Sequence, residues 1–336
     1  MYLGIDIGGT VTKLGLFCGD LNLIAEETIE TDSIRHPGTA CDILADRVQQ
    51  FMCYDGASPN RPLAVGVAAP GVFDKQTGLV KQAANLPQWE NRNLYADLSH
   101  VIGSTVVLVN DASAAALAEF QHRELKETNS LVLLTLGTGI GGGIVIDGRP
   151  VTGSHGCGAE VGHMVIDHSV GARSCGCGRV GHLEAYAGAR GVVKRTDDQL
   201  AAGEASTLHA RTLLEPLTPK VIAEEAEAGD PLSQLIIKQT AFYLGVGISQ
   251  ICHVIDPDHV VLGGGMNFGG TKTELGRSFL NDIRQTLRQF SLDQIAESTE
   301  VEFSALGNAA GVRGAAIFAR SYVNIGTPDG SCVLTP

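Results

Sequence analysis

Three short glycine clusters follow apolar segments of the sequence, and two of them carry a threonine. They are Gly8-Gly9-Thr10, Gly137-Thr138-Gly139 and Gly263-Gly264-Gly265. Because glycine has no Cβ atom, the backbone at such a turn can approach a ligand and direct successive N–H groups at phosphate oxygens. The threonine hydroxyls add donors, and Lys13 lies close enough in the sequence to add a positive charge. Together the three clusters favour phosphate binding over ordinary tight turns, which is the alternative for any one of them.

The glycine clusters do not match the common nucleotide-binding motifs. No Walker loop of the form G-x-x-x-x-G-K-[ST] occurs in the sequence. The stretch Gly137-x-Gly139-x-x-Gly142 matches the dinucleotide pattern, but an apolar, strand-like segment follows it rather than a helix. The sequence therefore indicates a different class of phosphate site.

Asp111 and its neighbour Asn110 lie between an apolar segment, 106–109, and an alanine-rich helix predicted over 112–120. Transfer of a phosphoryl group to a hydroxyl requires a base that accepts the hydroxyl proton. A carboxylate at the end of a strand is well placed for this, since α/β sheets bind ligands there. The alternative is that Asp111 is the N-cap of the helix. The two roles are compatible, and we favour the catalytic one.

A compact set of thiol and imidazole groups indicates a metal site. Cys175, Cys177 and His182 lie within eight residues, and His163 precedes Cys175 by twelve. Thiolate and imidazole ligands on a glycine-rich connection suit tetrahedral zinc, whereas the alternative is a loop with two incidental thiols. Four protein ligands leave no open position for a reactive water, so the predicted zinc is structural. Through His163 it would fix the loop that carries Glu160.

The elements that must position these residues follow from hydrophobic spacing and from glycine or proline boundaries. Strands are predicted at 2–7, 14–18, 21–30, 63–68, 106–109, 131–136, 142–146 and 260–262, and helices over 39–52, 112–120, much of 186–253, and 309–319. The order of strand, Gly/Thr turn and returning strand occurs near residue 2 and again near residue 131. This weak internal repeat predicts duplicated α/β domains that face a common cleft.

Composition restricts the class of protein. A chain of 336 residues exceeds what one core usually supports, so two domains are expected. The formal charge of −13 argues against a nucleic-acid partner, and no segment approaches the ~20 uninterrupted apolar residues of a membrane span. The N-terminus lacks the basic region of a signal peptide, and the eight cysteines do not form a disulfide pattern. We therefore expect a cytoplasmic protein with reduced thiols and no membrane partner.

Several ordered motifs, from residue 3 to about residue 320, resemble the ROK family of repressors, open-reading-frame proteins and sugar kinases. They are Asp6-Ile7-Gly8-Gly9-Thr10 with Lys13, Leu136 to Gly143, and Glu160-Val161-Gly162-His163. The resemblance implies an α/β fold of the actin-like ATPase (ribonuclease H-like) type, with two domains that close a cleft on ATP and a hexose. We expect a smaller N-terminal domain over 1–118, completed by a helix near 309–320. A larger domain with the zinc loop is expected over 119–308, and a peripheral tail over 321–336.

The resemblance also implies an activity, which is the ATP-dependent phosphorylation of a hexose with Asp111 as the base. Glucose, giving glucose 6-phosphate, is the leading acceptor; N-acetylmannosamine, fructose and allose are the alternatives. ATP would be bound with Mg²⁺, and a homodimer is the family expectation. The expected ATP-binding residues are Asp6, Gly8, Gly9, Thr10, Lys13, Gly137, Thr138, Gly139, Gly263, Gly264 and Gly265. The expected sugar-binding residues are Gly71, Asn85, Asn110, Asp111, Glu160, His163 and Glu184.

The sequence departs from the family at one ligand of the predicted zinc site. The family pattern is C-x-C-G-x-x-G-C-x-E, and this chain has His182 at the third cysteine. Histidine is a competent zinc ligand, so a site of two cysteines and two histidines, Cys175, Cys177, His163 and His182, is expected. For Asn85 a turn residue before proline is nearly as good an interpretation as a sugar ligand.

Two other classes of function are weighed against the kinase. Repressors of this family carry a helix-turn-helix domain before the first motif, whereas here that strand is expected from residue 3 and the net charge is acidic. A sugar-binding protein without activity is disfavoured by Asp111 and the glycine turns. The kinase is therefore the leading hypothesis, and the repressor a less favoured alternative.

Overall fold

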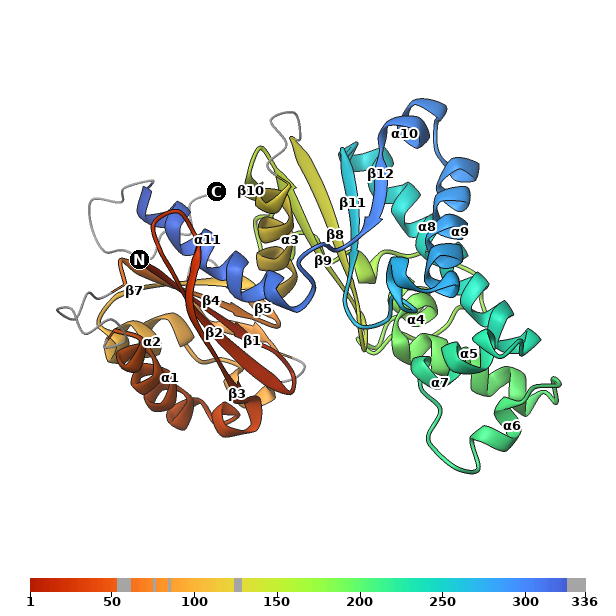
Figure 1. Ribbon diagram of the computed structural model, residues 1–336, viewed down its shortest axis with the longest axis horizontal. Helices are drawn as coiled ribbons and strands as arrows, with labels where there is room; N and C mark the ends of the chain where they lie inside the picture. Colours follow the sequence, from red (N-terminus) through yellow and green to blue (C-terminus); the bar gives the residue numbers. More distant parts are fainter. Residues whose placement is uncertain (53–61, 75–76, 84–85, 124–128, 325–336) are drawn as a thin grey trace. The chain divides into compact units, whose positions relative to one another are not determined.

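The computed structural model describes residues 1–52, 62–74, 77–83, 86–123 and 129–324 (Figure 1). The chain divides into two compact units. Unit 1 comprises Met1–Lys126, Gly143–Ala159 and Leu306–Pro336, and unit 2 comprises Glu127–Gly142 and Glu160–Ala305. Of the tail predicted over 321–336, residues 321–324 instead continue the last helix, Ala310–Asn324. The rest of that tail and the predicted sugar ligand Asn85 lie outside the described residues.

A five-stranded sheet forms the centre of unit 1. Its strands are β1 (Tyr2–Ile7), β2 (Val11–Phe17), β3 (Leu23–Glu30), β4 (Ala64–Ala69) and β7 (Thr105–Asn110), in the order β3-β2-β1-β4-β7. The first three strands are antiparallel neighbours, whereas β1, β4 and β7 run parallel. A short hairpin of β5 (Val72–Phe73) and β6 (Val80–Gln82) follows β4. The parallel strands consequently bring three carboxyl ends to one edge of the sheet.

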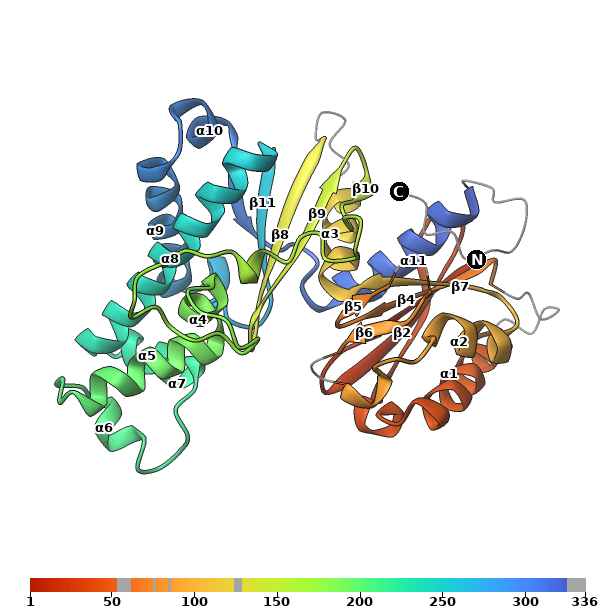
Figure 2. The ribbon, with the colours of Figure 1, turned by 180° about the vertical axis from the view of Figure 1, so that it is seen from behind.

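Helices cover both faces of this sheet (Figure 2). On one face lie α1 (Pro37–Met52) and α2 (Leu94–Ile102), which pack with the sheet around a core that includes Leu44, Leu98 and Trp89. On the other face lie α3 (Asp111–His122) and α11 (Ala310–Asn324), where alanine dominates the contact. Short 3-10 turns occur at Thr31–Ile34, Pro87–Trp89 and Gly307–Ala309. Small side chains on the second face let the helices lie close to the strands and to each other.

The second sheet has the order β10-β9-β8-β11-β12. Its strands are β8 (Ser130–Leu136), β9 (Ile140–Ile146), β10 (Arg149–Pro150), β11 (His259–Gly263) and β12 (Glu300–Phe303). Both β8 and β12 pair with β11 in parallel. The carboxyl ends of β8 and β11 therefore also meet at one edge, and a glycine cluster follows each of them.

The helices of unit 2 occupy most of the chain between β10 and β12. They are α4 (Leu183–Ala187), α5 (Ala189–Ala201), α6 (Leu208–Arg211), α7 (Pro219–Glu227), α8 (Pro231–Ile255), α9 (Glu274–Phe290) and α10 (Asp293–Ser298), with 3-10 turns at Val161–His163 and Gly270–Lys272. Among the described residues α8 alone has the length and apolar composition to cross a membrane. It packs against α9, α7, α4 and α5, and 61% of its apolar window is buried, as in a core helix.

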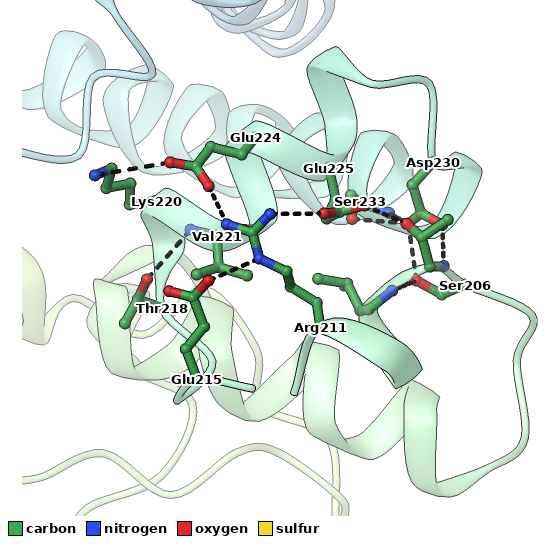
Figure 3. Close-up of polar contacts among 12 residues, drawn as sticks. Ser206, Arg211, Glu215, Thr218, Lys220, Val221, Glu224, Glu225, Asp230 and Ser233 are labelled. Carbon is green, nitrogen blue, oxygen red and sulfur yellow. Dashed lines mark hydrogen bonds and ion pairs between the residues drawn. The ribbon is translucent and has the colours of Figure 1, made fainter. Parts of the chain in front are cut away.

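A polar network fixes the short helix α6 (Figure 3). The guanidinium of Arg211 binds Glu215 at 2.7 Å, Glu225 at 3.3 Å and Glu224. Asp230, the N-cap of α8, accepts from Ser233 N–H at 2.8 Å and also binds the segment before α6. Arg211 thus joins α6 to α7 through Glu224 and Glu225, beside the buried side chains of Leu208 and Ile222.

Candidate active site and metal cluster

Three predicted ligand-binding residues of unit 1 lie at the carboxyl edge of its parallel strands. Asp6 is the penultimate residue of β1, Gly71 follows β4, and Asn110 ends β7. Register pairs Asp6 with Ala68 and Ala69 with Asn110, so the three positions are neighbours across the sheet. This edge is where open α/β sheets bind ligands.

Asn110, rather than Asp111, is the N-cap of α3. The side-chain oxygen of Asn110 accepts from the backbone N–H groups of Ala112 and Ser113 at 3.0 and 3.1 Å. Its amide nitrogen donates to the carbonyl of Gly71 at 3.3 Å, which ties α3 to the end of β4. The capping interpretation of Asp111 is therefore wrong, because its neighbour performs that function. Asp111 is the first helical residue, and its carboxylate accepts from Ala112 N–H at 2.9 Å.

Asp6 and Asp111 are partly buried and lie close enough to affect each other. Burial raises the pKa of Asp111, and the backbone N–H groups of Ala112 and of Asp111 itself oppose the rise. Burial, reinforced by the negative charge of Asp111, raises the pKa of Asp6 to about 6, against the opposing charge of Lys13. Two neighbouring carboxylates with raised pKa values at a sheet edge are typical of a functional site.

The first glycine turn, Gly8–Thr10, connects β1 to β2 and is supported from behind. Gly8 N–H donates to Val11 O at 3.1 Å, and the Thr31 hydroxyl donates to Gly8 O at 2.9 Å. The backbone N–H of Thr31 donates to Thr10 O at 2.8 Å. Gly9 and Thr10 are exposed. Because Thr31 engages carbonyl groups of the turn, the turn is fixed on one side and accessible on the other.

Lys13 lies on β2 directly opposite Asp6. Its ammonium group donates to the carbonyl of Asn308 at 2.7 Å, just before α11. The sequence gives no sign of Thr31 or Asn308 as partners of the first glycine motif, since neither belongs to a local pattern. Both contacts arise from the way the sheet and α11 bring distant segments together.

The two glycine turns of unit 2 are adjacent. Gly137–Gly139 follows β8, and Gly263–Gly265 begins at the last residue of β11. The parallel pairing aligns Gly263 with Thr135. Met266 N–H, just after the second turn, donates to Leu136 O at 3.0 Å. The first N–H groups of α5 also hold the first turn, since Ala189 donates to Gly137 O at 3.0 Å and Arg190 to Thr138 O at 3.3 Å. These N–H groups have no partner within their own helix, which is why they are available.

Four predicted metal ligands of unit 2 converge on one point, and we call them the His/Cys cluster. The cluster comprises His163, Cys175, Cys177 and His182, whose ligand atoms all lie within 4.8 Å of one another. His163 Nδ1 is 3.2 Å from His182 Nδ1, His182 Nδ1 is 3.3 Å from Cys177 Sγ, and His163 Nδ1 is 3.8 Å from Cys175 Sγ. The ligands come from the Val161–His163 turn, the loop before α4 and the N-cap of α4.

These separations fit a tetrahedral zinc ion. With zinc–nitrogen and zinc–sulfur bonds of their usual lengths, tetrahedral ligands lie about 3.3 Å (N···N) and about 3.6 Å (N···S) apart. Burial, followed by the charge of His163, lowers the pKa of His182, which favours the neutral imidazole that binds metals. Burial raises the pKa of Cys175 to about 12, because it disfavours the charged thiolate. A bound cation would stabilise that thiolate.

The predicted sugar ligands Glu160 and Glu184 both lie beside the His/Cys cluster. A carboxylate oxygen of Glu160 is 3.9 Å from His163 Nε2. Glu184, in the first turn of α4, accepts from the Cys175 thiol at 3.4 Å and from Ile140 N–H at 3.1 Å. Glu184 therefore contacts both the metal cluster and the end of a glycine turn, which its sequence motif does not reveal.

Among the residues described, the structure brings the predicted positions together in two sets, one in each unit. Unit 1 holds Asp6, Gly8, Gly9, Thr10, Lys13, Gly71, Asn110 and Asp111. Unit 2 holds Gly137, Thr138, Gly139, Glu160, His163, Cys175, Cys177, His182, Glu184, Gly263, Gly264 and Gly265.

Known proteins match the chain over nearly its whole length. A glucokinase of Halalkalibacterium halodurans is 29% identical over 320 residues, covering 93% of each chain. An N-acetyl-D-glucosamine kinase of Citrobacter koseri is 30% identical and covers 94% of this chain and 98% of that one.

Solved structures agree with these relatives. The ROK hexokinase of Thermus thermophilus has a TM-score of 0.80 at 30% identity, covering 97% of this chain and 99% of that chain. The ROK family glucokinase of Streptomyces griseus, in complex with glucose and AMPPNP, has a TM-score of 0.73 at 28% identity, covering 95% and 99%. These similarities confirm the predicted two-domain α/β fold of the actin-like ATPase type. Residues 2–322 match the ROK family, and the chain belongs to it.

Proposed function

We propose that the protein is an ATP-dependent hexose kinase in which Asp111 accepts the proton of the attacking sugar hydroxyl. The observation that carries this proposal is that Asn110, and not Asp111, caps the N-terminus of α3. Asn110 satisfies the helix terminus, so the Asp111 carboxylate is not needed there. A carboxylate with a raised pKa at the carboxyl edge is a competent base for a hydroxyl group.

The reaction follows from the groups assigned to each partner. A sugar hydroxyl oxygen forms a bond to the γ-phosphorus of ATP while the bond between that phosphorus and the β,γ-bridging oxygen breaks, releasing ADP. Asp111 takes the hydroxyl proton. Backbone N–H groups of the glycine turns at Gly8–Thr10, Gly137–Gly139 and Gly263–Gly265 bind phosphate oxygens. When bound with ATP, Mg²⁺ supplies neutralisation of the phosphate charge.

Glucose is the proposed acceptor, with an N-acetylated or another hexose as the alternative. The family resemblance assigns Gly71, Asn85, Asn110, Glu160, His163 and Glu184 to the sugar. Amide and carboxylate groups recognise pairs of neighbouring hydroxyls, and a site of this kind discriminates strongly against analogues that lack one. The relatives named glucokinase and N-acetyl-D-glucosamine kinase are almost equally similar, so the acceptor must be tested directly.

The decisive experiment measures ADP release with glucose, N-acetylglucosamine, N-acetylmannosamine, mannose, fructose and allose as acceptors. We expect glucose to give the highest kcat/KM. Asp111→Asn should lower kcat by about 10²–10⁴-fold and leave sugar affinity within a few-fold, because it removes a base but not the binding contacts. Asp46→Asn, an exposed carboxylate on α1, is the matched control and should retain full turnover. Sugar binding without ADP release from any acceptor would refute the kinase and favour a sugar-responsive regulator.

We also propose that the His/Cys cluster holds a structural Zn²⁺. Its support is the donor set and the ligand separations of 3.2, 3.3 and 3.8 Å. Metal analysis of protein purified without chelator should find about one zinc per chain, and Cys177→Ser should lower that content and the thermal stability. Cys157→Ser, an exposed thiol outside the cluster, is the control. Protein that folds fully without zinc and does not take it up would refute the assignment.

A homodimer and a cytoplasmic location stay predictions from the family resemblance and the composition.

A further inference from the structure

Glu184 fills the space between the His/Cys cluster and the glycine turn Gly137–Gly139. One carboxylate oxygen lies 3.4 Å from the Cys175 sulfur, which donates to it as a free thiol and packs against it as a cation-bound thiolate. The other oxygen accepts from Ile140 N–H at 3.1 Å. The carboxylate also lies directly against the Cα atom of Gly139, where any side chain would overlap it. The Glu184 carboxylate therefore packs directly between Cys175, a sulfur ligand of the cluster, and Gly139, the last residue of the turn.

The carbonyl group of Ile140 contacts the segment that carries the cluster ligand His163. The carbonyl oxygen of Ile140 lies against Gly162, and a side chain at that position would overlap it. Gly162 directly precedes the cluster ligand His163 within the 3-10 turn Val161–His163. Ile140 is thus contacted through its N–H by the segment after His182 and through its carbonyl by the segment before His163.

The peptide groups around Ile140 set the direction in which the preceding turn presents its N–H groups. A phosphate site of backbone donors works only when those donors are held in place before the ligand arrives. Removing the cation from the cluster would leave its four ligands without a common centre. The two segments that hold Ile140 would then lose their fixed separation.

We propose that the His/Cys cluster, when it holds its cation, sets the conformation of the Gly137–Gly139 turn through Ile140 and thereby raises affinity for ATP. Glu184 is the positioning residue of this coupling. The inference rests on the proposed function for the assignment of the turn to ATP. It differs from the coupling of the metal to the sugar-binding loop, since it concerns nucleotide binding in the absence of sugar.

The test measures binding of AMPPNP to the full chain by calorimetry, without sugar, for zinc-loaded and chelator-treated protein. Removing zinc should weaken AMPPNP binding about tenfold, as expected when the hydrogen bond between Glu184 and Ile140 N–H loses its alignment. Glu184→Ala on zinc-loaded protein should weaken it similarly and should add little once zinc is removed, because both perturbations break one connection. Glu184→Gln retains an oxygen for Ile140 N–H and should bind close to the parent value. Glu297→Ala, on α10, is the control for loss of a carboxylate elsewhere in unit 2.

Thermodynamic reciprocity supplies an independent readout. If zinc tightens AMPPNP binding by some factor, AMPPNP must tighten zinc binding by the same factor, measured by competition with a chelating dye. Equal AMPPNP affinity with and without zinc, or a Glu184→Ala chain that keeps both zinc and nucleotide affinity, overturns the proposal.

Amide hydrogen exchange can test whether zinc rigidifies the turn independently of whether the turn binds ATP. Exchange of the peptide over residues 137–142 should accelerate when zinc is removed, whether or not the chain binds nucleotide. Accelerated exchange in a chain that does not bind AMPPNP would support the mechanical coupling and refute the assignment of the turn to ATP. Unchanged exchange would overturn the coupling itself.

Discussion

Gly314, in the second turn of α11, allows that helix to lie directly on α3. A Cβ atom at this position would overlap the backbone carbonyl of Ala114 in α3. Because the overlapping atoms belong to the backbone of α3 and not to a flexible side chain, the overlap is removed only if the two helices move apart. Asp111 is the first residue of α3, so the packing of α11 also positions the proposed base.

Helix propensity and packing predict opposite signs for Gly314→Ala. Alanine in place of glycine inside a helix should stabilise it by about 1 kcal/mol. Overpacking a close contact typically costs about 1–3 kcal/mol, and the rigid obstacle places this case at the upper end. The expected net effect is a loss of about 2 kcal/mol from unit 1. Gly38→Ala in α1 is the matched control, because its nearest neighbour would be the His36 ring at 3.6 Å. That variant should be neutral or slightly stabilising.

Fluorescence of Trp89 during urea unfolding is a suitable assay. Trp89 is the single tryptophan of the chain and is 2% exposed, with its indole N–H donating to Arg35 O at 2.9 Å. It belongs to the same unit as α11, so it reports on that unit even if the other unfolds separately. A loss of about 2 kcal/mol lowers the urea midpoint by about 1 M. A Gly314→Ala chain that is as stable as the parent, or more stable, would show that α11 can move away from α3 without cost.

The remaining predictions concern the carboxyl edge of unit 1. Because burial raises the pKa of Asp111, kcat/KM should fall at acid pH through a pKa above the ordinary aspartate value, and Asp111→Asn should remove that dependence; a pH-independent rate between pH 4 and 7 would contradict it. The pKa of Asp6 is raised to about 6 from an unfolded value of 3.8, so the native state binds more protons between those values and stability falls as pH rises through that window. Asp6→Asn should therefore stabilise unit 1 above pH 6, by about 3 kcal/mol at most, and a loss of stability there would refute the reasoning. Asn110→Ala should cost about 1 kcal/mol through loss of the α3 cap, and Asn110→Ser should recover most of it, both measured by Trp89 fluorescence.

The elements bounded by glycine were predictable from the sequence. Strands β1, β8 and β11 are apolar runs that end in a glycine cluster, and each observed strand agrees with its predicted range to within a residue or two. These strands are buried on both faces, so a continuous apolar run is their signature. Helix α3 was predicted for a different reason, because its sequence is rich in alanine, which strongly favours a helix.

Other elements depend on contacts that are distant in the sequence. Strand β12 (Glu300–Phe303) alternates glutamate with apolar residues and is a strand because it pairs with β11. Helix α9 (Glu274–Phe290) is different, since Phe279, Leu280, Ile283 and Leu287 are buried at helical spacing. The pattern was present in the sequence, and α9 is missing from our predictions although it is one of the longest helices described.

The site was predictable as a set of residues but not as a set of contacts. Motif spacing indicated the four members of the His/Cys cluster, because ligands close in sequence have few ways to converge. The contact of Glu184 with Ile140 joins positions 44 residues apart and has no local signal. The same holds for Thr31, which reaches the first glycine turn only because β3 returns beside β2.

The two carboxylates at the edge of unit 1 are difficult to explain by stability. Burial raises the pKa of both Asp6 and Asp111, and their mutual repulsion adds to the cost for Asp6. The structural role that an aspartate could have at the start of α3 is already performed by Asn110. Amides of the same shape at both positions would avoid the cost of burying charge. Stability alone therefore does not explain why both positions carry carboxylates. A carboxylate at Asp111 can accept the proton of a sugar hydroxyl, as proposed above, and an amide at that position cannot.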